Sequence, residues 1–235
     1  LERTASTDLF LELTPEKVLE AVEAAGLETS PVCQALNSFE NRVYDVVVYD
    51  DDGEEGHVVA KFYRPGRWTE AQILEEHRFM NALDEAEVPL CRLRPFPDGT
   101  TLKRIEGIFY CLYPRFGGRA PDELNDELVE RLGMLTARMH NVGAAETSLT
   151  RVRINADTYV RHDLEWLLDQ GVLPEALRDR YAAAAYDLAD IYERVSEGAA
   201  VQRIQGDLHA GNLLLRDGLL HLLDFGLAWE GVPPF

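Results

Sequence analysis

Apolar positions follow two different spacings along the chain, and the spacing changes near its middle. Up to residue 114 the apolar runs are short and bounded by turn residues, which predicts strands at 43–49, 58–63, 101–106 and 108–113. Two helical patterns interrupt these strands. One covers residues 15–25, with Thr14 before Pro15 as its N-cap and Gly26 at its end, and the other runs from the capping box at Thr69–Gln72 to about Glu85.

Beyond residue 119 the apolar spacing becomes helical. One helix face is marked by Leu124, Leu128, Leu132, Leu135 and Met139, and we expect this helix to end near residues 140–143. Residues 159–169 and 174–196 predict two further helices. The segment 114–119, Pro-Arg-Phe-Gly-Gly-Arg, breaks the regular pattern between the strand-rich and the helix-rich parts, so it is the best candidate for a linker.

A hairpin is predicted near the end of the chain, at Asp217-Gly218 between two leucine-rich runs. Folding the chain about this turn sets Asn212 opposite Leu223. Asp224 therefore lies within a residue of Asn212, although twelve positions separate them in the sequence. Asp207 lies in the Gly-flanked loop that leads into the first strand. Two carboxylates and an amide oxygen thus converge at one end of the hairpin.

This group of residues suits phosphoryl transfer, which needs hard oxygen ligands for magnesium and an acceptor for the proton of the substrate hydroxyl. We predict that Asp207 is the catalytic base and that Asn212 and Asp224 are metal ligands, which gives Asp224 a catalytic role as well. The spacing Asp-x-x-x-x-Asn followed by Asp-Phe-Gly is the kinase pattern. The alternative is a polar turn ahead of an ordinary hairpin.

Three segments carry a resemblance to a known superfamily. Residues 206–212, Gly-Asp-Leu-His-Ala-Gly-Asn, resemble the Gly-Asp-x-His-x-x-Asn catalytic loop of the aminoglycoside-phosphotransferase-like kinases. Residues 36–44 (Leu-Asn-Ser-Phe-Glu-Asn-Arg-Val-Tyr) and 62–68 (Phe-Tyr-Arg-Pro-Gly-Arg-Trp) resemble the bacterial stress-response serine/threonine protein kinases of that superfamily. The likeness extends over roughly residues 15–230.

The resemblance implies an α+β, bilobal, protein-kinase-like fold. Residues 1–114 are expected to form a nucleotide-binding lobe with an antiparallel sheet and one helix, and residues 115–235 a mainly helical catalytic lobe. The implied activity is phosphate transfer from ATP, with magnesium, to an alcohol group, and a serine or threonine of a protein is the favoured acceptor. Two alternatives stay open: a kinase for small hydroxylated molecules of the aminoglycoside, choline or homoserine type, and a truncated module that binds nucleotide without turnover.

Four further segments are candidates for nucleotide binding. Lys61 ends an apolar strand and approximately matches the lysine that holds the α- and β-phosphates, although a snorkelling edge lysine is the alternative. Glu76 falls on the apolar stripe of its helix and needs a partner there, so we pair it with Lys61 and prefer it to Glu75. Ser38 and the following N–H groups are candidate phosphate contacts, against the alternative of a plain polar turn. The resemblance also puts the adenine near hinge residues Leu112, Tyr113 and Arg115.

Composition restricts the partners. The net charge of −19 over 235 residues argues against nucleic acid and anionic membranes, but not against ATP, because a metal can mediate between acidic groups and phosphates. The sequence has three scattered cysteines without a Cys-x-x-Cys motif, and it shows no apolar run of membrane-spanning length and no signal peptide. We therefore expect a reduced, cytoplasmic protein and a monomer.

Two features depart from the resembling kinases. Asp224-Phe225-Gly226 stands where the stress-response kinases carry a more acidic segment. The chain also stops nine residues past Gly226, where relatives continue with more helices. We therefore expect either a fragment or a minimal C-terminal lobe.

Overall fold

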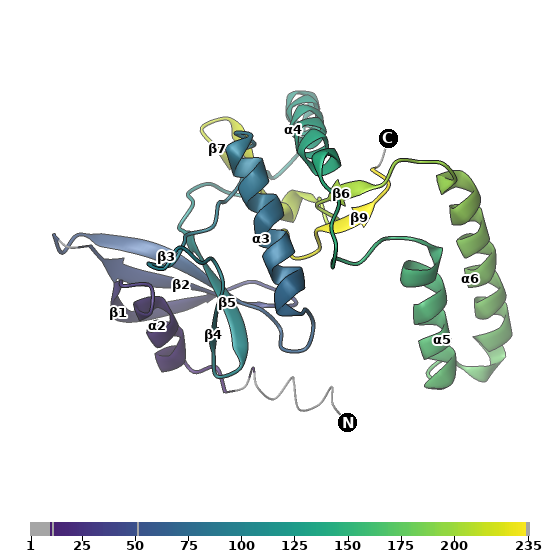
Figure 1. The fold of residues 1–235 in the computed structure, drawn as a ribbon, viewed down its shortest axis with the longest axis horizontal. Coiled ribbons are helices and arrows are strands. Elements are labelled where there is room, and N and C mark those ends of the chain that lie inside the picture. The colour runs from purple at the N-terminus through teal and green to yellow at the C-terminus, as the bar shows by residue number, and fades with distance from the viewer. Residues whose placement is uncertain (1–9, 11, 51, 234–235) are drawn as a thin grey trace. The chain divides into compact units, whose positions relative to one another are not determined.

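The computed structural model describes residues 10, 12–50 and 52–233, which form two compact units (Figure 1). The first unit consists of residues up to Leu135 together with His209–Gly226. The second consists of Thr136–Leu208 and the residues from Leu227 onward. The chain therefore leaves the second unit to form the predicted hairpin in the first and then returns. This division differs from the expected lobes, 1–114 and 115–235, and that lobe assignment stays a prediction.

The first unit is built on a five-stranded antiparallel sheet in the order β1-β2-β3-β5-β4 (Figure 1). Its strands are β1 (Glu28–Leu36), β2 (Arg42–Tyr49), β3 (Glu55–Phe62), β4 (Lys103–Ile105) and β5 (Ile108–Pro114). Four of these strands were predicted, although β4 is shorter than the expected 101–106. The edge strand β1 was not predicted, because Pro31 and a register irregularity between Thr29 and Cys33 obscure its alternation.

Two helices pack on opposite faces of this sheet. Helix α2 (Pro15–Glu23) covers the face that carries Ala60 and Phe62, where the buried apolar residues of α2, β2, β3 and β5 form one cluster. Helix α3 (Glu70–Glu85) lies on the face of Lys61, because successive residues of a strand point to opposite faces. The predicted capping box at its start is present, with Thr69 and Gln72 bonded reciprocally.

The predicted hairpin is formed by β7 (Leu213–Arg216) and β8 (Leu219–Leu222), with Leu213 opposite Leu222. Asp217 and Gly218 both have positive φ, 50° and 78°, as a type I′ turn requires. The predicted linker, residues 114–119, is bonded to neighbouring strands. Pro114 still belongs to β5, and Arg119 exchanges two backbone hydrogen bonds with Leu215 of β7, at 2.8 and 3.2 Å.

The second unit is mainly helical. It contains the π-helical turn η1 (Asp157–Arg161), α5 (His162–Asp169) and α6 (Glu175–Ser196), together with a two-stranded sheet of β6 (Gln202–Ile204) and β9 (Trp229–Gly231). Helix α4 (Asp126–Ala145) begins in the first unit and ends in the second. It ends at Ala145, two residues past the expected end near 140–143, because Asn141, Val142 and Gly143 continue the helix.

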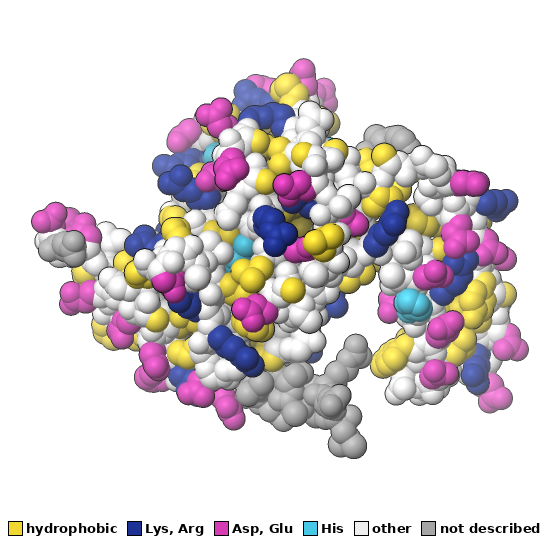
Figure 2. Space-filling model, viewed as in Figure 1, with side chains coloured by type: hydrophobic (Ala, Val, Ile, Leu, Met, Phe, Trp, Pro, Cys, Tyr) yellow, Lys and Arg dark blue, Asp and Glu magenta, His cyan; other side chains and the backbone are white. Residues whose placement is uncertain are grey.

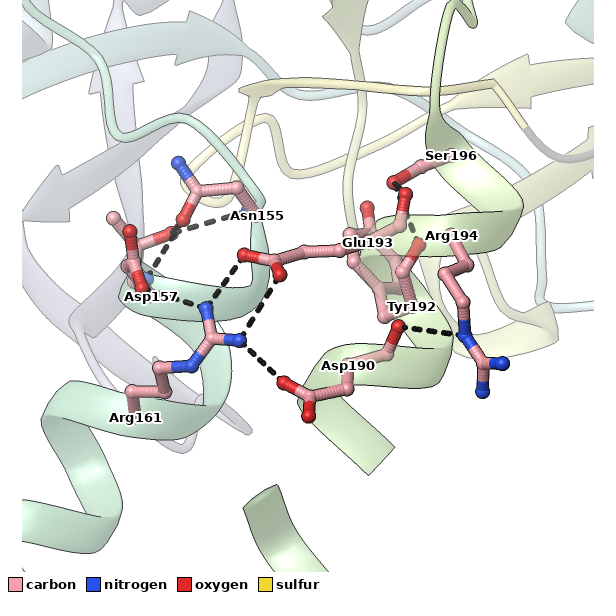
Figure 3. A network of polar contacts seen from close by, with 9 residues as sticks. Asn155, Asp157, Arg161, Asp190, Tyr192, Glu193, Arg194 and Ser196 are labelled. Atoms are coloured by element: carbon pink, nitrogen blue, oxygen red, sulfur yellow. Dashed lines mark hydrogen bonds and ion pairs between the residues drawn. The ribbon is translucent and has the colours of Figure 1, made fainter. Parts of the chain in front are cut away.

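An exposed ion-pair network joins η1 to α6 (Figure 3). The Arg161 guanidinium donates to Asp157 at 2.8 Å, to Asp190 at 2.9 Å and to Glu193 at 2.6 Å. The hydrogen bonds that Arg161 donates to these three carboxylates, the one to Glu193 first, raise its pKa. We assign this network a structural role, because it fixes the π-helical turn against a neighbouring helix.

The surface is strongly acidic, and Asp and Glu side chains are scattered over the face shown in Figure 2. Five large apolar side chains of α6 are exposed, between 45% and 72% accessible: Leu177, Tyr181, Leu188, Ile191 and Val195. Among the described residues, no helix has both the length and the apolar character needed to cross a bilayer.

Candidate active site

Lys61 stands at the centre of the candidate site in the first unit. Its Nζ lies 3.3 Å from Glu76 Oε1 on α3 and 2.9 Å from Asp224 Oδ1, which follows β8. The predicted pairing of Lys61 with Glu76 is therefore confirmed. Glu75 instead lies 3.8 Å from Arg78, one turn along the same helix. One ammonium group thus connects the sheet, helix α3 and the segment after the hairpin.

The three charges differ in burial. The Glu76 side chain is fully buried and Lys61 is 6% exposed, whereas the Asp224 side chain is 48% exposed. Burial by itself lowers the pKa of Lys61, but the Asp224 and Glu76 carboxylates outweigh it and hold that pKa above its usual value. Lys61 in turn lowers the pKa of Asp224. Both groups are therefore charged at neutral pH.

Asp224 owes its position to the hairpin register and to a strained backbone. The carbonyl of Asn212 accepts a hydrogen bond from Leu223 N at 2.9 Å, which places Asn212 opposite the residue before Asp224, as predicted. Asp224 has a φ of 44°, in the left-handed region that a non-glycine residue rarely occupies. Gly226 N donates to Asp224 Oδ1 at 3.0 Å, and Phe225 is buried edge-on against Phe79. Such strain is typical of functional sites.

The loop that carries Asp207 belongs to the second unit and is anchored by its neighbours. Asp207 N donates to Oε1 of the buried Gln205 at 2.7 Å. Gly206 has a φ of 82°, and a Cβ at this position would lie 2.0 Å from the carbonyl oxygen of Leu227. The backbone path therefore requires a glycine at position 206. His209 Nδ1 accepts a hydrogen bond from Gly211 N at 3.0 Å, within the same loop.

Ser38 lies half-buried in the loop between β1 and β2, residues 37–41. Two other side chains of this loop are anchored to the segment after β3. Glu40 accepts from Trp68 Nε1 at 3.3 Å, and Asn41 Oδ1 accepts from Arg64 N at 3.2 Å. The loop is therefore held at two points on the Lys61 side of the sheet, and the phosphate-binding role of Ser38 stays a prediction.

The hinge residues are partly occupied by other contacts. The Leu112 side chain is fully buried in the cluster beneath α2, and its carbonyl accepts from Arg94 N at 2.7 Å. The Arg115 guanidinium forms an ion pair with the buried Asp45 of β2. Burial raises the pKa of Tyr113 well above its usual value. A contact of Leu112, Tyr113 or Arg115 with adenine stays a prediction.

Sequence reasoning missed a group of buried polar residues behind the Lys61–Glu76 pair. Tyr63 donates to Glu76 Oε1 at 3.1 Å and also contacts His77 and the thiol of Cys111. Two features of the sequence indicate this group of buried polar residues. Tyr63 follows Lys61 by two residues, so the two share one face of the strand, and His77 directly follows Glu76.

Asn212 and Asp224 could supply part of the coordination shell of a divalent metal ion. Among the described residues, no three His, Cys, Asp or Glu side chains gather as a metal site. Asn212 and Asp224 offer an amide oxygen and a half-exposed carboxylate, which are hard ligands of the kind magnesium takes. The residues fit magnesium bound jointly with nucleotide phosphates and water rather than by protein ligands alone.

Comparison with known proteins identifies the family of this chain. Residues 32–233 match the model of the phosphotransferase enzyme family, APH. The chain belongs to this family. Stress response kinase A of Shigella flexneri is 35% identical over 210 residues, covering 89% of this chain and 62% of that protein. The same kinase from Escherichia coli (strain K12) is 34% identical over 210 residues, with the same coverage. The predicted resemblance is thereby confirmed.

Solved structures of other phosphotransferases have a similar fold. Amicoumacin kinase hAmiN, in complex with AMP-PNP, Ca2+ and Ami, superposes with a TM-score of 0.71 at 19% identity, over 92% of this chain and 64% of that one. The GDP and kanamycin complex of APH(2")-IIia gives 0.63 at 19% identity, over 92% and 73%. These likenesses confirm the predicted α+β, aminoglycoside-phosphotransferase-like fold. The chain spans about 62% of the length of the curated relatives it matches.

Proposed function

We propose that this chain is the nucleotide-binding and catalytic part of an ATP- and magnesium-dependent kinase that phosphorylates a serine or threonine of a protein. The observation that carries the proposal is the position of Lys61, bonded at once to the buried Glu76 and to Asp224. A lysine held in this way presents a fixed positive charge, which suits the α- and β-phosphates of a nucleotide.

Asp224 and Asn212 would hold the magnesium ion, which supplies charge neutralisation at the transferring phosphate. Asp224 is half exposed, so it can exchange part of its contact with Lys61 for a metal ligand. The anchored loop at residues 37–41, with Ser38, would cover the phosphates through its backbone N–H groups. Leu112, Tyr113 and Arg115 at the end of β5 are the proposed neighbours of the adenine.

Asp207 is the proposed general base. The support is its spacing to Asn212, the family membership of residues 32–233, and the local rigidity that Gly206 and Gln205 give its loop. A carboxylate in this role accepts the proton of the attacking hydroxyl, and such catalysis contributes roughly 10²–10⁴-fold to the rate.

A protein acceptor is favoured because of the relatives. Sequences 33–35% identical to this chain are named stress response kinase A or serine/threonine protein kinase RdoA, whereas the kinases with antibiotic ligands are 19% identical. A small cationic substrate is the second candidate, because the net charge of −19 attracts cations. In either case we propose a cytoplasmic monomer.

The test is calorimetric titration with ATP, in magnesium and then in chelator, followed by labelled phosphate transfer to a panel of basic proteins and aminoglycosides. We expect tighter ATP binding with magnesium and transfer to a protein serine or threonine. Transfer to aminoglycosides alone would favour the second candidate. Normal ATP binding without any transfer would support a nucleotide-binding module.

A further inference from the structure

We propose that Tyr63 is a positioning residue, which holds Glu76 and Lys61 in the geometry that nucleotide binding requires. This inference rests on the proposed function, because it takes Lys61 as the phosphate-binding group. It assigns a role to a buried tyrosine hydroxyl that takes no part in metal binding or proton transfer.

Tyr63 contacts both members of the ion pair. Its hydroxyl donates to Glu76 Oε1 at 3.1 Å, the same oxygen that lies 3.3 Å from Lys61 Nζ. Its ring faces the ammonium group, with Lys61 Nζ 4.9 Å from the ring centroid, within the range of a cation–π contact. The side chain is 1% exposed and follows β3 directly, so the sheet itself fixes its direction.

The hydroxyl in turn is oriented by a chain of hydrogen bonds. Its oxygen lies 3.0 Å from His77 Nε2, and His77 Nδ1 lies 2.8 Å from Thr101 Oγ1. An ionised carboxylate only accepts, so Tyr63 gives its one proton to Glu76 and must accept from His77 Nε2–H. At its other ring nitrogen, Nδ1, His77 is hydrogen-bonded to the Thr101 hydroxyl. The carboxylate of Glu76 therefore sets the direction of the bond between Tyr63 and His77.

The relay connects three elements of the first unit. Tyr63 follows β3, Glu76 and His77 lie on α3, and Thr101 precedes β4. Because the bonds run through buried side chains, turning or sliding α3 would break several of them together. Burial keeps the pKa of Tyr63 well above its usual value, so the hydroxyl remains a donor throughout the neutral range. The relay thus holds Glu76 at the distance from the sheet at which it meets Lys61.

Removing the hydroxyl leaves the ring in place but takes one donor from a fully buried carboxylate. Glu76 then depends more on Lys61, which also bonds the half-exposed Asp224. The ammonium group is drawn toward Glu76 and becomes less available to phosphates. A hydrogen bond to a charged group is worth on the order of tenfold in an equilibrium, so we expect about tenfold weaker ATP binding for Tyr63→Phe.

The experiment compares ATP dissociation constants and the separate kcat and KM values of wild type, Tyr63→Phe, Tyr110→Phe and Lys61→Met. Tyr110 is a matched control, because it is a tyrosine 2% exposed in the cluster beneath α2, on the other face of the sheet. We expect Tyr63→Phe to raise KM for ATP about tenfold and to change kcat less, while Tyr110→Phe affects thermal stability alone.

The outcomes separate this inference from the proposed function. If Lys61→Met does not weaken ATP binding, the proposed function itself is wrong. If Lys61→Met weakens it while Tyr63→Phe binds ATP like the Tyr110→Phe control, the positioning role is wrong and the proposed function stands. Should Tyr63→Phe fail to fold, Thr101→Val at the far end of the relay replaces it. We expect about threefold weaker binding there, and an unchanged constant would overturn the relay.

Discussion

Removing Lys61 should destabilise the protein more than neutralising Glu76, although the two form one ion pair. Lys61→Met leaves the Glu76 carboxylate fully buried without its cation, which costs about 3–5 kcal/mol of unfolding free energy. Glu76→Gln keeps an oxygen that can still accept from Lys61 and Tyr63, and Lys61 keeps Asp224 at 2.9 Å. We therefore expect a loss of about 1–2 kcal/mol for Glu76→Gln.

Urea unfolding at pH 7 measures both losses, and the double variant completes a thermodynamic cycle. Because Lys61→Met already removes the interaction, adding Glu76→Gln should then cost nothing further and can restore part of the stability, so the losses are not additive. The same cycle measured on ATP affinity should also be non-additive. Glu75→Gln is the matched control, since its carboxylate is 3.8 Å from Arg78 and should leave ATP affinity unchanged. Additive losses, or a larger loss for Glu76→Gln, would refute the reasoning.

Three further predictions address the metal, the pH dependence and the catalytic loop. Asp224→Ala should weaken ATP binding in magnesium but barely in chelator, and equal weakening in both would exclude Asp224 as a ligand. Lys61 lowers the pKa of Asp224 in the folded protein. The ionised Asp224 side chain therefore contributes stability above the unfolded-state pKa of about 3.9, and this contribution is lost as the pH falls through the pKa of Asp224 in the folded state. The difference in unfolding free energy between wild type and Asp224→Asn should therefore be flat from about pH 5 to 9 and shrink below about pH 4; a difference that grows in acid would contradict this. Gly206→Ala should cost at least about 2 kcal/mol of unfolding free energy, measured in urea, because the added Cβ would lie 2.0 Å from the Leu227 carbonyl oxygen. Gly117→Ala is the control and should be nearly neutral, since an added Cβ there has nothing within 4 Å. Equal losses of unfolding free energy for the two variants would show that the loop relaxes freely.

The hairpin shows how far the sequence alone could predict the site. Asp217-Gly218 determines the turn, and the antiparallel register that this two-residue turn sets then places Asn212 opposite Leu223 without any knowledge of the rest of the fold. The pairing of Lys61 with Glu76 was predicted in the same way, from a charge placed on an apolar helix face. Local rules with a fixed period suffice for such cases.

The contacts that sequence reasoning missed depend on long-range packing. Tyr63 reads as an ordinary aromatic residue of a strand until α3 brings His77 over it. Asp45 meets Arg115 only because β2 and β5 both flank β3. Asp224 adopts a left-handed backbone, which aspartate tolerates better than most residues but which the sequence around it did not indicate. For Tyr63 and Asp45 the partner lies on an element whose placement depends on the packing of the whole unit, which the sequence pattern did not provide.

Phosphate transfer by Asp207→Asn tests the central claim most directly. The substitution is nearly isosteric and removes the proposed proton acceptor while leaving the hydrogen bond from its backbone to Gln205 intact. The measurement is labelled phosphate transfer to the acceptor found in the panel, beside an ATP titration of the same protein. We predict that transfer falls by roughly 10²–10⁴-fold while the ATP dissociation constant changes less than about twofold. Full transfer activity in Asp207→Asn would contradict the account of this chain as a kinase that uses this loop.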